Sequence, residues 1–234
     1  MMEEIFWNSI SAYNAATWPW QLAFVAVAAV LTLVLWFRPA RWARTAMKIY
    51  MVAVSLWIAF VYYMKFAAAR DFSNVLTIFW CMVAASWLYD LVTGFSTFQK
   101  SGKTRFWGAV MLLLPLAYPL ISIARGLEFP QVTTPVIPSA VALYMLGMLM
   151  AFNRKINFFA FIFIFHWAII AMSKISIFNI PEDILLAAAC IPSMAVFFIR
   201  AVRSAGQEYK PSRKYVEVLI VAVALVAGAC MFIA

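Results

Sequence analysis

Long apolar runs alternate with short polar connections along most of the chain. Eight runs have about the length that a helix needs to cross the hydrocarbon core of a bilayer, which is about 20 residues. They cover residues 20–37, 46–66, 74–97, 106–124, 136–152, 157–175, 183–202 and 214–234. The fifth run is the shortest, and Pro135 and Pro138 at its start leave a partly re-entrant segment as the alternative to a full span. The pattern predicts an all-α, polytopic membrane bundle of eight spans, forming one transmembrane domain over residues 1–234.

The stretch ahead of the first run, "SAYNAATWPWQ", mixes aromatic and polar side chains around one proline. Phe6, Ile10 and Tyr13 recur at helical spacing, which predicts a short interfacial helix over residues 4–16, lying on the membrane surface. Pro19 then fits the first turn of the spanning helix, where its missing N–H leaves no bond unmade.

Two interpretations of this stretch remain open. Trp and Tyr are favoured at the membrane–water interface, so an aromatic anchor is the first expectation. An aromatic anchor does not explain why the amides Asn14 and Gln21 accompany the aromatic residues. The second expectation is therefore an outer vestibule lined by Tyr13, Asn14, Trp18 and Gln21.

Composition supports the membrane assignment. Of 234 residues, 67% are hydrophobic and 12% are charged, which leaves a soluble domain too few polar groups to cover its surface. The acidic start "MMEEIF" lacks the basic region of a cleavable signal peptide, so we expect the first span to be retained. The three cysteines lie in apolar runs without a C-x-x-C pair, so neither a disulfide framework nor a zinc site is indicated.

The basic residues fall in alternate loops. Of 18 Lys and Arg residues, all but Lys65, Arg70, Arg125 and Lys174 lie in the loops after the first, third, fifth and seventh spans. Six of the nine acidic residues lie on the other side, among them Glu182 and Asp183, which solvated loop charge or an acidic face for cation entry explains equally well. Lys174, near the outer end of its span, is expected to extend its ammonium group to the interface. The positive-inside rule then places both termini outside the cytoplasm, in a bacterial inner membrane. The net charge of +9 thus reports topology, and no nucleic-acid partner is expected.

One motif resembles a known family. The segment "FWNSISAYNAATWPWQ" is similar to the N-terminal signature of an uncharacterised bacterial multi-pass family, the domain of unknown function 6064. The pattern is F-W, then Y-N-x-x-x-W-P-x-Q. "LWIAFVYYMKF", "TTPVIPSAVALYMLGMLM" and "IPEDILLAAACIPS" resemble later parts of the family more loosely. The resemblance implies a multi-pass fold and carries no activity, cofactor or site residue.

Asp90 is one of two ionisable residues expected well inside a span. Ser86, Thr93 and Thr97 share its helix face within an arc of roughly 60°. Such a polar stripe should face the bundle interior or a watery cavity. The structural alternative, which is slightly favoured, is that Asp90 pairs with a cytoplasmic-side base such as Lys100 or Arg105, or caps a neighbouring backbone.

His166 is the other such residue, near the middle of the sixth span. An imidazole suits a proton relay or a general base, although a neutral histidine bonded to a backbone carbonyl is as plausible. A single histidine cannot supply bis-histidine haem ligation, so no cofactor and no metal site are expected.

Prolines within spans give a third indication. Pro115, Pro119 and Pro192 would each free a backbone carbonyl, as in the broken helices of transporters, although each alone more often only kinks a helix. In the last span, Ala224 and Gly228 have the spacing that permits close helix packing, within one subunit or in a homo-oligomer.

Three functions remain in consideration. A transporter or channel for a small solute or ion comes first, because polar groups and prolines interrupt the spans and no soluble domain exists. An intramembrane enzyme acting on a lipid-like substrate comes second, and it requires Asp90 and His166 to share one cavity. A non-catalytic membrane scaffold subunit comes third. No catalytic residue is assigned.

Overall fold

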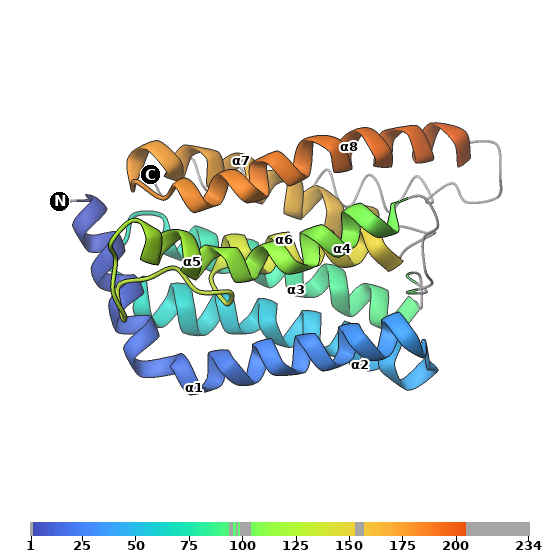
Figure 1. The fold of residues 1–234 in the computed structure, drawn as a ribbon, viewed down its shortest axis with the longest axis horizontal. Helices are drawn as coiled ribbons and strands as arrows, with labels where there is room; N and C mark the ends of the chain where they lie inside the picture. Colours follow the sequence, from blue (N-terminus) through green and yellow to red (C-terminus); the bar gives the residue numbers. More distant parts are fainter. Residues whose placement is uncertain (1, 94–95, 97, 99–103, 153–156, 205–234) are drawn as a thin grey trace.

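The protein is an elongated bundle of antiparallel helices in the computed structural model, which describes residues 2–93, 96, 98, 104–152 and 157–204 (Figure 1). All regular structure in these residues is helical. Among the described residues, six helical segments are long and apolar enough to cross a membrane, and a seventh helix is apolar but shorter. The predicted span 214–234, with Ala224 and Gly228, lies outside the described residues.

The first helix differs from the prediction. Residues Met2–Phe37 form one continuous helix, α1, so the prediction that residues 4–16 form a separate helix is wrong. That these residues lie at the membrane surface stays a prediction. Pro19 lies inside α1, where it removes one backbone hydrogen bond. Figure 1 shows the N-terminal part of α1 inclined to the rest. Polar side chains in the N-terminal part of α1 form hydrogen bonds with other segments, as described below, and these bonds hold that part of the helix in place.

The remaining helices follow the predicted spans closely. They are α2 (Arg41–Leu56), a π-helix (Trp57–Phe66), α3 (Ser73–Thr93), α4 (Arg105–Leu113), a 3-10 turn (Leu114–Leu116), α5 (Ala117–Ala124), α6 (Pro138–Phe152), α7 (Phe158–Ile177), a 3-10 turn (Pro181–Asp183) and α8 (Ile184–Ser204). The π-helix extends α2 without a break, and its last turn closes with a hydrogen bond from Ala67 N to Tyr62 O of 2.8 Å.

Helix α6 is the central helix of the bundle. It has 15 residues, and all but Tyr144 are buried. It packs on α4, α7 and α8. Its neighbours cover it, and α6 is accordingly apolar on all sides. It is shorter than the six segments that are long enough to cross a membrane.

Small residues bring α4 and α6 into backbone contact. A Cβ atom built at Gly108 would lie 2.4 Å from the backbone nitrogen of Ala151, and one at Gly147 would lie 2.9 Å from that of Leu112. Close approach of this kind replaces hydrophobic attraction as the source of helix association in lipid.

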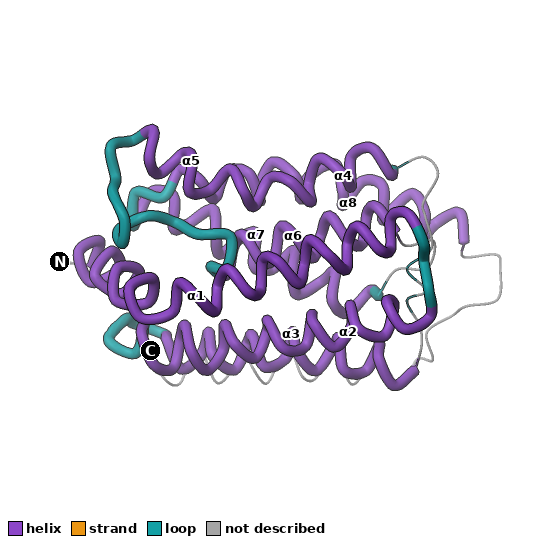
Figure 2. Tube along the Cα trace, turned by 60° about the horizontal axis from the view of Figure 1, so that its bottom comes forward, coloured by secondary structure: helices purple, strands orange, loops and turns teal. Residues whose placement is uncertain are grey.

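The helix connections gather at two ends of the bundle (Figure 2). The N-terminal end carries the start of α1 and the connections 67–72, 125–137 and 178–180. The opposite end, called here the basic end, carries the connection 38–40 and the starts of α2, α4 and α7. Arg38, Arg41, Arg44 and Arg105 lie at the basic end.

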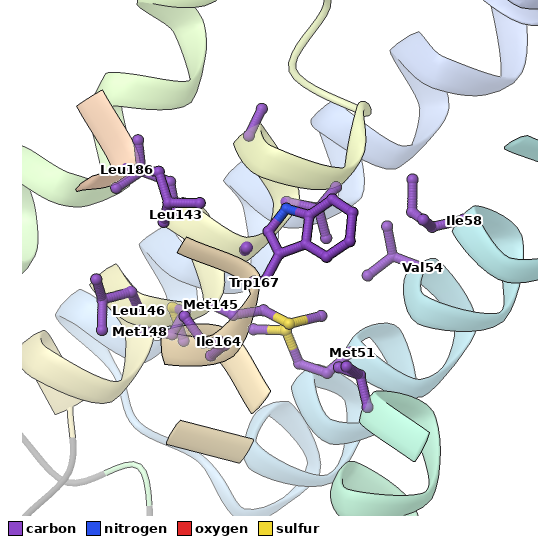
Figure 3. Packing of buried hydrophobic residues seen from close by; sticks show 14 of the residues in the cluster. Met51, Val54, Ile58, Leu143, Met145, Leu146, Met148, Ile164, Trp167 and Leu186 are labelled. Atoms are coloured by element: carbon purple, nitrogen blue, oxygen red, sulfur yellow. The ribbon is translucent and has the colours of Figure 1, made fainter. Parts of the chain in front are cut away.

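The middle of the bundle is apolar. Figure 3 shows Met51, Val54, Ile58, Leu143, Leu146 and Leu186 around Trp167, with side chains from five helical segments. The indole of Trp167 also contacts the rings of Phe79 and Trp80 on α3. Polar groups therefore concentrate toward the two ends.

Candidate functional site

A buried ion pair joins α2 and α3 near the basic end. Lys48 Nζ lies 3.0 Å from Asp90 Oδ1 and donates a second hydrogen bond of 3.0 Å to the Asp90 carbonyl oxygen. Both side chains are almost completely excluded from solvent. Removing each charge from water costs free energy, and the attraction between the two charges at this short distance offsets that cost.

Two more groups complete the Asp90 cluster, defined as Lys48, Asp90, Ser96 and Asn157. The Ser96 backbone N–H donates to Asp90 Oδ1 at 2.6 Å. Asn157 Nδ2 donates to Asp90 Oδ2 at 3.2 Å and to the Ser86 carbonyl oxygen at 3.1 Å. Asn157 also caps α7 by accepting from Ala160 N. Both carboxylate oxygens of Asp90 are thus satisfied.

The polar stripe around Asp90 is only partly present. Ser86 is buried, but its hydroxyl donates to Val83 O, one turn earlier. Thr93 is exposed and bonds Tyr89 O, while Thr97 lies outside the described residues. The expectation that Asp90 faces the interior agrees with its burial. Its partner is Lys48, which was counted among the loop residues in the sequence analysis, and not Arg105. The Arg105 guanidinium group stacks on the ring of Trp36.

His166 lies elsewhere. It is exposed on the surface of α7, and its Nδ1 lies 3.0 Å from Ile162 O within the same helix. Asn157, which contacts Asp90, precedes His166 by nine residues, or roughly 13 Å along a helix. The structure therefore does not bring Asp90 and His166 into one site.

A second polar cluster lies at the N-terminal end, around Glu182. Arg125 Nη1 donates to both Glu182 oxygens at 3.1 Å, and Ser122 Oγ donates to Glu182 Oε1 at 2.6 Å. Thr133 joins Ser122 through its backbone N–H, at 3.0 Å, and its hydroxyl bonds the Tyr118 carbonyl oxygen. The cluster ties α5 and the connection 125–137 to the start of α8.

Asp183 extends this cluster inward. Its Oδ2 lies 2.7 Å from Lys174 Nζ, and that ammonium also donates to Ser139 Oγ at 3.0 Å. Trp167 Nε1 donates to the same hydroxyl at 3.3 Å. The hydroxyl group of Tyr118 lies beside Asp183. We refer to these residues as the Glu182–Asp183 cluster, which comprises Tyr118, Ser122, Arg125, Thr133, Ser139, Lys174, Glu182 and Asp183.

The burial of these acids corrects an expectation. The sequence suggested that Glu182 and Asp183 were solvated loop charges and that Lys174 extended toward the interface. Both carboxylates are instead fully buried, and each is paired with a base. Their position just before α8 also favours negative charge, because the N-terminus of a helix carries partial positive charge.

The opening motif divides into two faces. Tyr13, Asn14 and Gln21 are buried, whereas Trp18 is 51% exposed. Asn14 Nδ2 donates to Pro130 O at 2.8 Å and to Val132 O at 2.7 Å. The outward face fits an aromatic anchor, and the inward face holds the connection 125–137 in place.

Two further contacts support this second role. Tyr13 donates its hydroxyl hydrogen to Val136 O at 2.9 Å and accepts a hydrogen bond from Trp57 Nε1. Gln21 Nε2 donates to Asn14 Oδ1 at 3.1 Å and to Thr17 Oγ1 at 2.9 Å, which fixes the orientation of the Asn14 amide. A vestibule lined by these residues stays a prediction.

Replacing Asn14 by Leu, which has a similar volume, should lower the free energy of unfolding by about 1–3 kcal/mol, because it leaves two buried carbonyl groups without a donor. The melting temperature of the detergent-purified protein measures the effect. Trp18→Leu, on the exposed face, is the control and should change stability by at most about 0.5 kcal/mol. Equal stability of Asn14→Leu and the wild type would contradict the assigned role.

The prolines differ from one another. Pro115 is buried in the 3-10 turn that separates α4 from α5, so this helix is interrupted as expected. Pro119 lies in the first turn of α5, and Pro192 lies inside α8, which continues through it. Ser193, next to Pro192, donates to Ala189 O, one turn earlier. Cation or substrate binding at these positions stays a prediction.

Metal-binding side chains do not cluster in the described part of the chain. Within it, no group of three or more His, Cys, Asp or Glu residues lies close enough to hold an ion. The two cysteines described there, Cys81 and Cys190, are free thiols.

Sequence reasoning missed the bases that pair with the buried acids. Lys48, Arg125 and Lys174 each lie near the end of an apolar run, where a long basic side chain usually extends into water. One signal was available for Lys48, because it recurs with Ala43, Met47 and Met51 on one helix face that is otherwise apolar.

Comparisons with known proteins identify one relationship. Residues 3–208 match the family described as "Family of unknown function (DUF6064)". No curated protein and no solved structure matches the chain. The match spans all the helices described above and confirms the resemblance inferred from the sequence.

Proposed function

Because this chain belongs to the DUF6064 family, whose function is unknown, we propose a role from its own residues: a multi-pass transporter for a small solute or ion. In this proposal the protein lies in a bacterial inner membrane with eight spans and both termini outside the cytoplasm. The Asp90 cluster and the Glu182–Asp183 cluster act as its inner and outer gates.

The observation that carries the proposal is the position of the buried charges. Buried ion pairs lie near both ends of the bundle: Lys48–Asp90 and Arg125–Glu182 join segments distant in the sequence, and Lys174–Asp183 joins α7 to the turn that follows it. An apolar layer around Trp167 separates them. A scaffold needs only apolar packing and small residues to hold helices together in lipid. Buried charges inside a membrane are costly and usually mark a functional path.

Ion pairs suit gates because they have two favourable states. A pair is stable when its members touch in a dry site, and each member is stable when separated and hydrated. Intermediate separations satisfy neither condition. Opening one cluster while the other stays paired would admit water from one side only, which is the requirement of alternating access.

The orientation rests on charge. Helices alternate in direction along the chain, so the ends of α1, α3 and α6 and the starts of α2, α4 and α7 share the basic end (Figure 1). The positive-inside rule assigns that end to the cytoplasm. The Asp90 cluster then lies near the cytoplasmic face, and the Glu182–Asp183 cluster lies near the outer face.

A scaffold is the second candidate, and a specific observation favours it. Every polar atom of the Asp90 carboxylate has a partner, and His166 faces outward, so the two residues singled out from the sequence form no open site. The enzyme hypothesis loses its basis for the same reason, because it needed both groups in one cavity.

Thiol accessibility at Ser55 tests the transporter against the scaffold. Ser55 is fully buried on the same face of α2 as Lys48, about two helical turns closer to the N-terminal end of the bundle. Ser55→Cys would be introduced after Cys81, Cys190 and Cys230 are replaced. Reaction with a membrane-impermeant maleimide would then be followed in right-side-out and inside-out vesicles.

A transporter should allow slow labelling of Cys at this position from both sides. Asp90→Asn should raise the rate from the cytoplasmic side, and Glu182→Gln should raise it from the outer side. Asp71→Asn removes an exposed carboxylate and should change neither rate. Absence of labelling from both sides in all variants would overturn the transporter and leave the scaffold.

A further inference from the structure

The basic end carries positive charge that the described residues do not compensate. Its arginines are Arg38, Arg41, Arg44 and Arg105. Asp90 is the one described acid near this end, and it is paired with Lys48. The other described acids lie at the N-terminal end, and none of the four arginines forms an ion pair with a described residue. This end of the bundle therefore attracts an anion from outside the chain.

Two of these arginines are held in place beside the end of α1. The guanidinium carbon of Arg105 lies 4.0 Å from the centre of the Trp36 ring, which packs edge-on against the buried ring of Phe152. Arg44 Nη2 donates to the carbonyl oxygen of Pro39 at 3.2 Å. The start of α4 lies beside the end of α1 (Figure 2), so both guanidinium groups flank the connection between α1 and α2.

Most N–H groups of these two side chains are unused. A guanidinium group carries five N–H donors in a planar fork, which matches two oxygen atoms of a phosphate group. The bond from Arg44 to Pro39 is the one hydrogen bond that either side chain forms with the described residues, and neither Nε atom has a partner there. Both side chains are half-buried and accessible from outside the bundle. They can therefore bind an oxyanion at the surface.

Aromatic residues accompany the arginines of the basic end. They lie next to them in the sequence, in the pairs Phe37–Arg38 and Arg41–Trp42 and in the run Arg105–Phe106–Trp107. All four aromatic side chains are exposed. Exposed aromatic rings favour the level of the lipid headgroups in a membrane protein. Guanidinium groups at the same level meet the phosphodiester groups of the lipids, and the rings meet the upper part of the acyl chains.

We propose that the basic end binds an anionic glycerophospholipid, whose phosphodiester group contacts Arg44 and Arg105. The acyl chains of the lipid lie along the exposed rings of Phe106 and Trp107. A zwitterionic phospholipid has the same phosphodiester group but adds an ammonium group, which the uncompensated arginines repel. This site goes beyond the proposed transport and does not depend on it.

Native mass spectrometry of the full-length protein, released from detergent micelles that contain a known amount of lipid, measures the Kd of each lipid. Dioleoylphosphatidylglycerol should bind about 10–25-fold more tightly than dioleoylphosphatidylcholine, because each of two arginines beside an anionic headgroup contributes about 5-fold. The two lipids have the same acyl chains, so the difference reports the headgroup charge.

Four variants locate the site. Arg44→Gln and Arg105→Gln should each weaken the binding of phosphatidylglycerol about 5-fold. Lys65→Gln, which removes an exposed charge at the N-terminal end, should leave the Kd unchanged. Arg105→Lys keeps the charge but lacks the planar fork that stacks on Trp36, and it should weaken binding about 2–10-fold. If a Gln variant does not fold, Arg105→Lys decides.

Three results would overturn the proposal. Equal binding of the two lipids would show that the headgroup charge is not recognised. An unchanged Kd in the Gln variants or in Arg105→Lys would show that diffuse positive charge, and not a site built from these guanidinium groups, attracts the lipid. An equal concentration of inorganic phosphate should not displace phosphatidylglycerol, and displacement would show that the anion alone occupies the arginines.

Discussion

Replacing Lys48 by Met is expected to lower the free energy of unfolding by about 3–5 kcal/mol, because it leaves the Asp90 carboxylate buried without a counter-charge. Met has a length similar to that of the Lys stem, so the loss reports charge rather than volume. Ser96 and Asn157 remain as hydrogen-bond donors to Asp90 and cannot supply a full positive charge. The melting temperature of the detergent-purified protein measures the effect.

A second substitution distinguishes charge from general damage. Lys48→Met combined with Asp90→Leu removes both charges, and it should be more stable than Lys48→Met alone, because no unpaired ion remains. Arg41→Met, an exposed change on the same helix, should change stability by at most about 0.5 kcal/mol. A double variant no more stable than Lys48→Met would contradict the ion-pair explanation.

Replacing Gly108 by Ala is expected to destabilise the protein by about 1–3 kcal/mol, the usual cost of overpacking. The added methyl group would meet the backbone nitrogen and Cα of Ala151 at 2.4 and 2.5 Å. Backbone atoms cannot move aside as the end of a side chain can, so α4 and α6 must separate. The separation would disturb α6, which packs on three helices.

The sign of this effect is informative. At an ordinary helical position, Gly→Ala stabilises by about 1 kcal/mol, because alanine is the better helix former. A fall in melting temperature therefore requires the close contact between α4 and α6. Ala109→Ser, which adds one atom at the next, half-buried position, serves as the control. A rise in the melting temperature of Gly108→Ala would show that the two backbones are not in contact.

The spans could be predicted from hydropathy because the bilayer sets a minimum length for an apolar helix. Seven of the eight predicted runs correspond to helices in the described part of the chain, and six of these meet the length that a span requires. The central position of α6 in the bundle could not be predicted, since a helix surrounded by lipid and a helix surrounded by protein have the same apolar sequence pattern. Its shortness was the only indication.

The candidate site was only half predictable. Asp90 was identified because a carboxylate in an apolar run is unusual, but its partner is 42 residues away in the sequence. Arg125 and Glu182 are 57 residues apart. Pairings at such sequence separations depend on which helices pack against each other, and a single sequence does not show the helix neighbours. Charges near the ends of apolar runs were therefore interpreted as solvated.

The opening motif shows the opposite case. An aromatic anchor was the first expectation, and only Asn14 and Gln21 were singled out as unexplained by it. The segment that Tyr13 and Asn14 bind, 130–136, could not be named in advance. The interfacial helix was inferred from the helical spacing of Phe6, Ile10 and Tyr13, and a new helix was expected to start at Pro19, because proline is favoured in the first turn of a helix. Tertiary contacts on the inward face of α1 outweigh that preference.

The bonds of Asn14 also bear on biosynthesis. Its two acceptors lie 116 and 118 residues further along the chain. At a translation rate of roughly 5–20 residues per second, Asn14 leaves the ribosome on the order of 10 s before Pro130 and Val132 are made. During that interval the amides of Asn14 and Gln21 need water or another donor and acceptor. The first helix therefore cannot take its final position until the fourth pass of the chain has been inserted, and its insertion is completed late although it is made first.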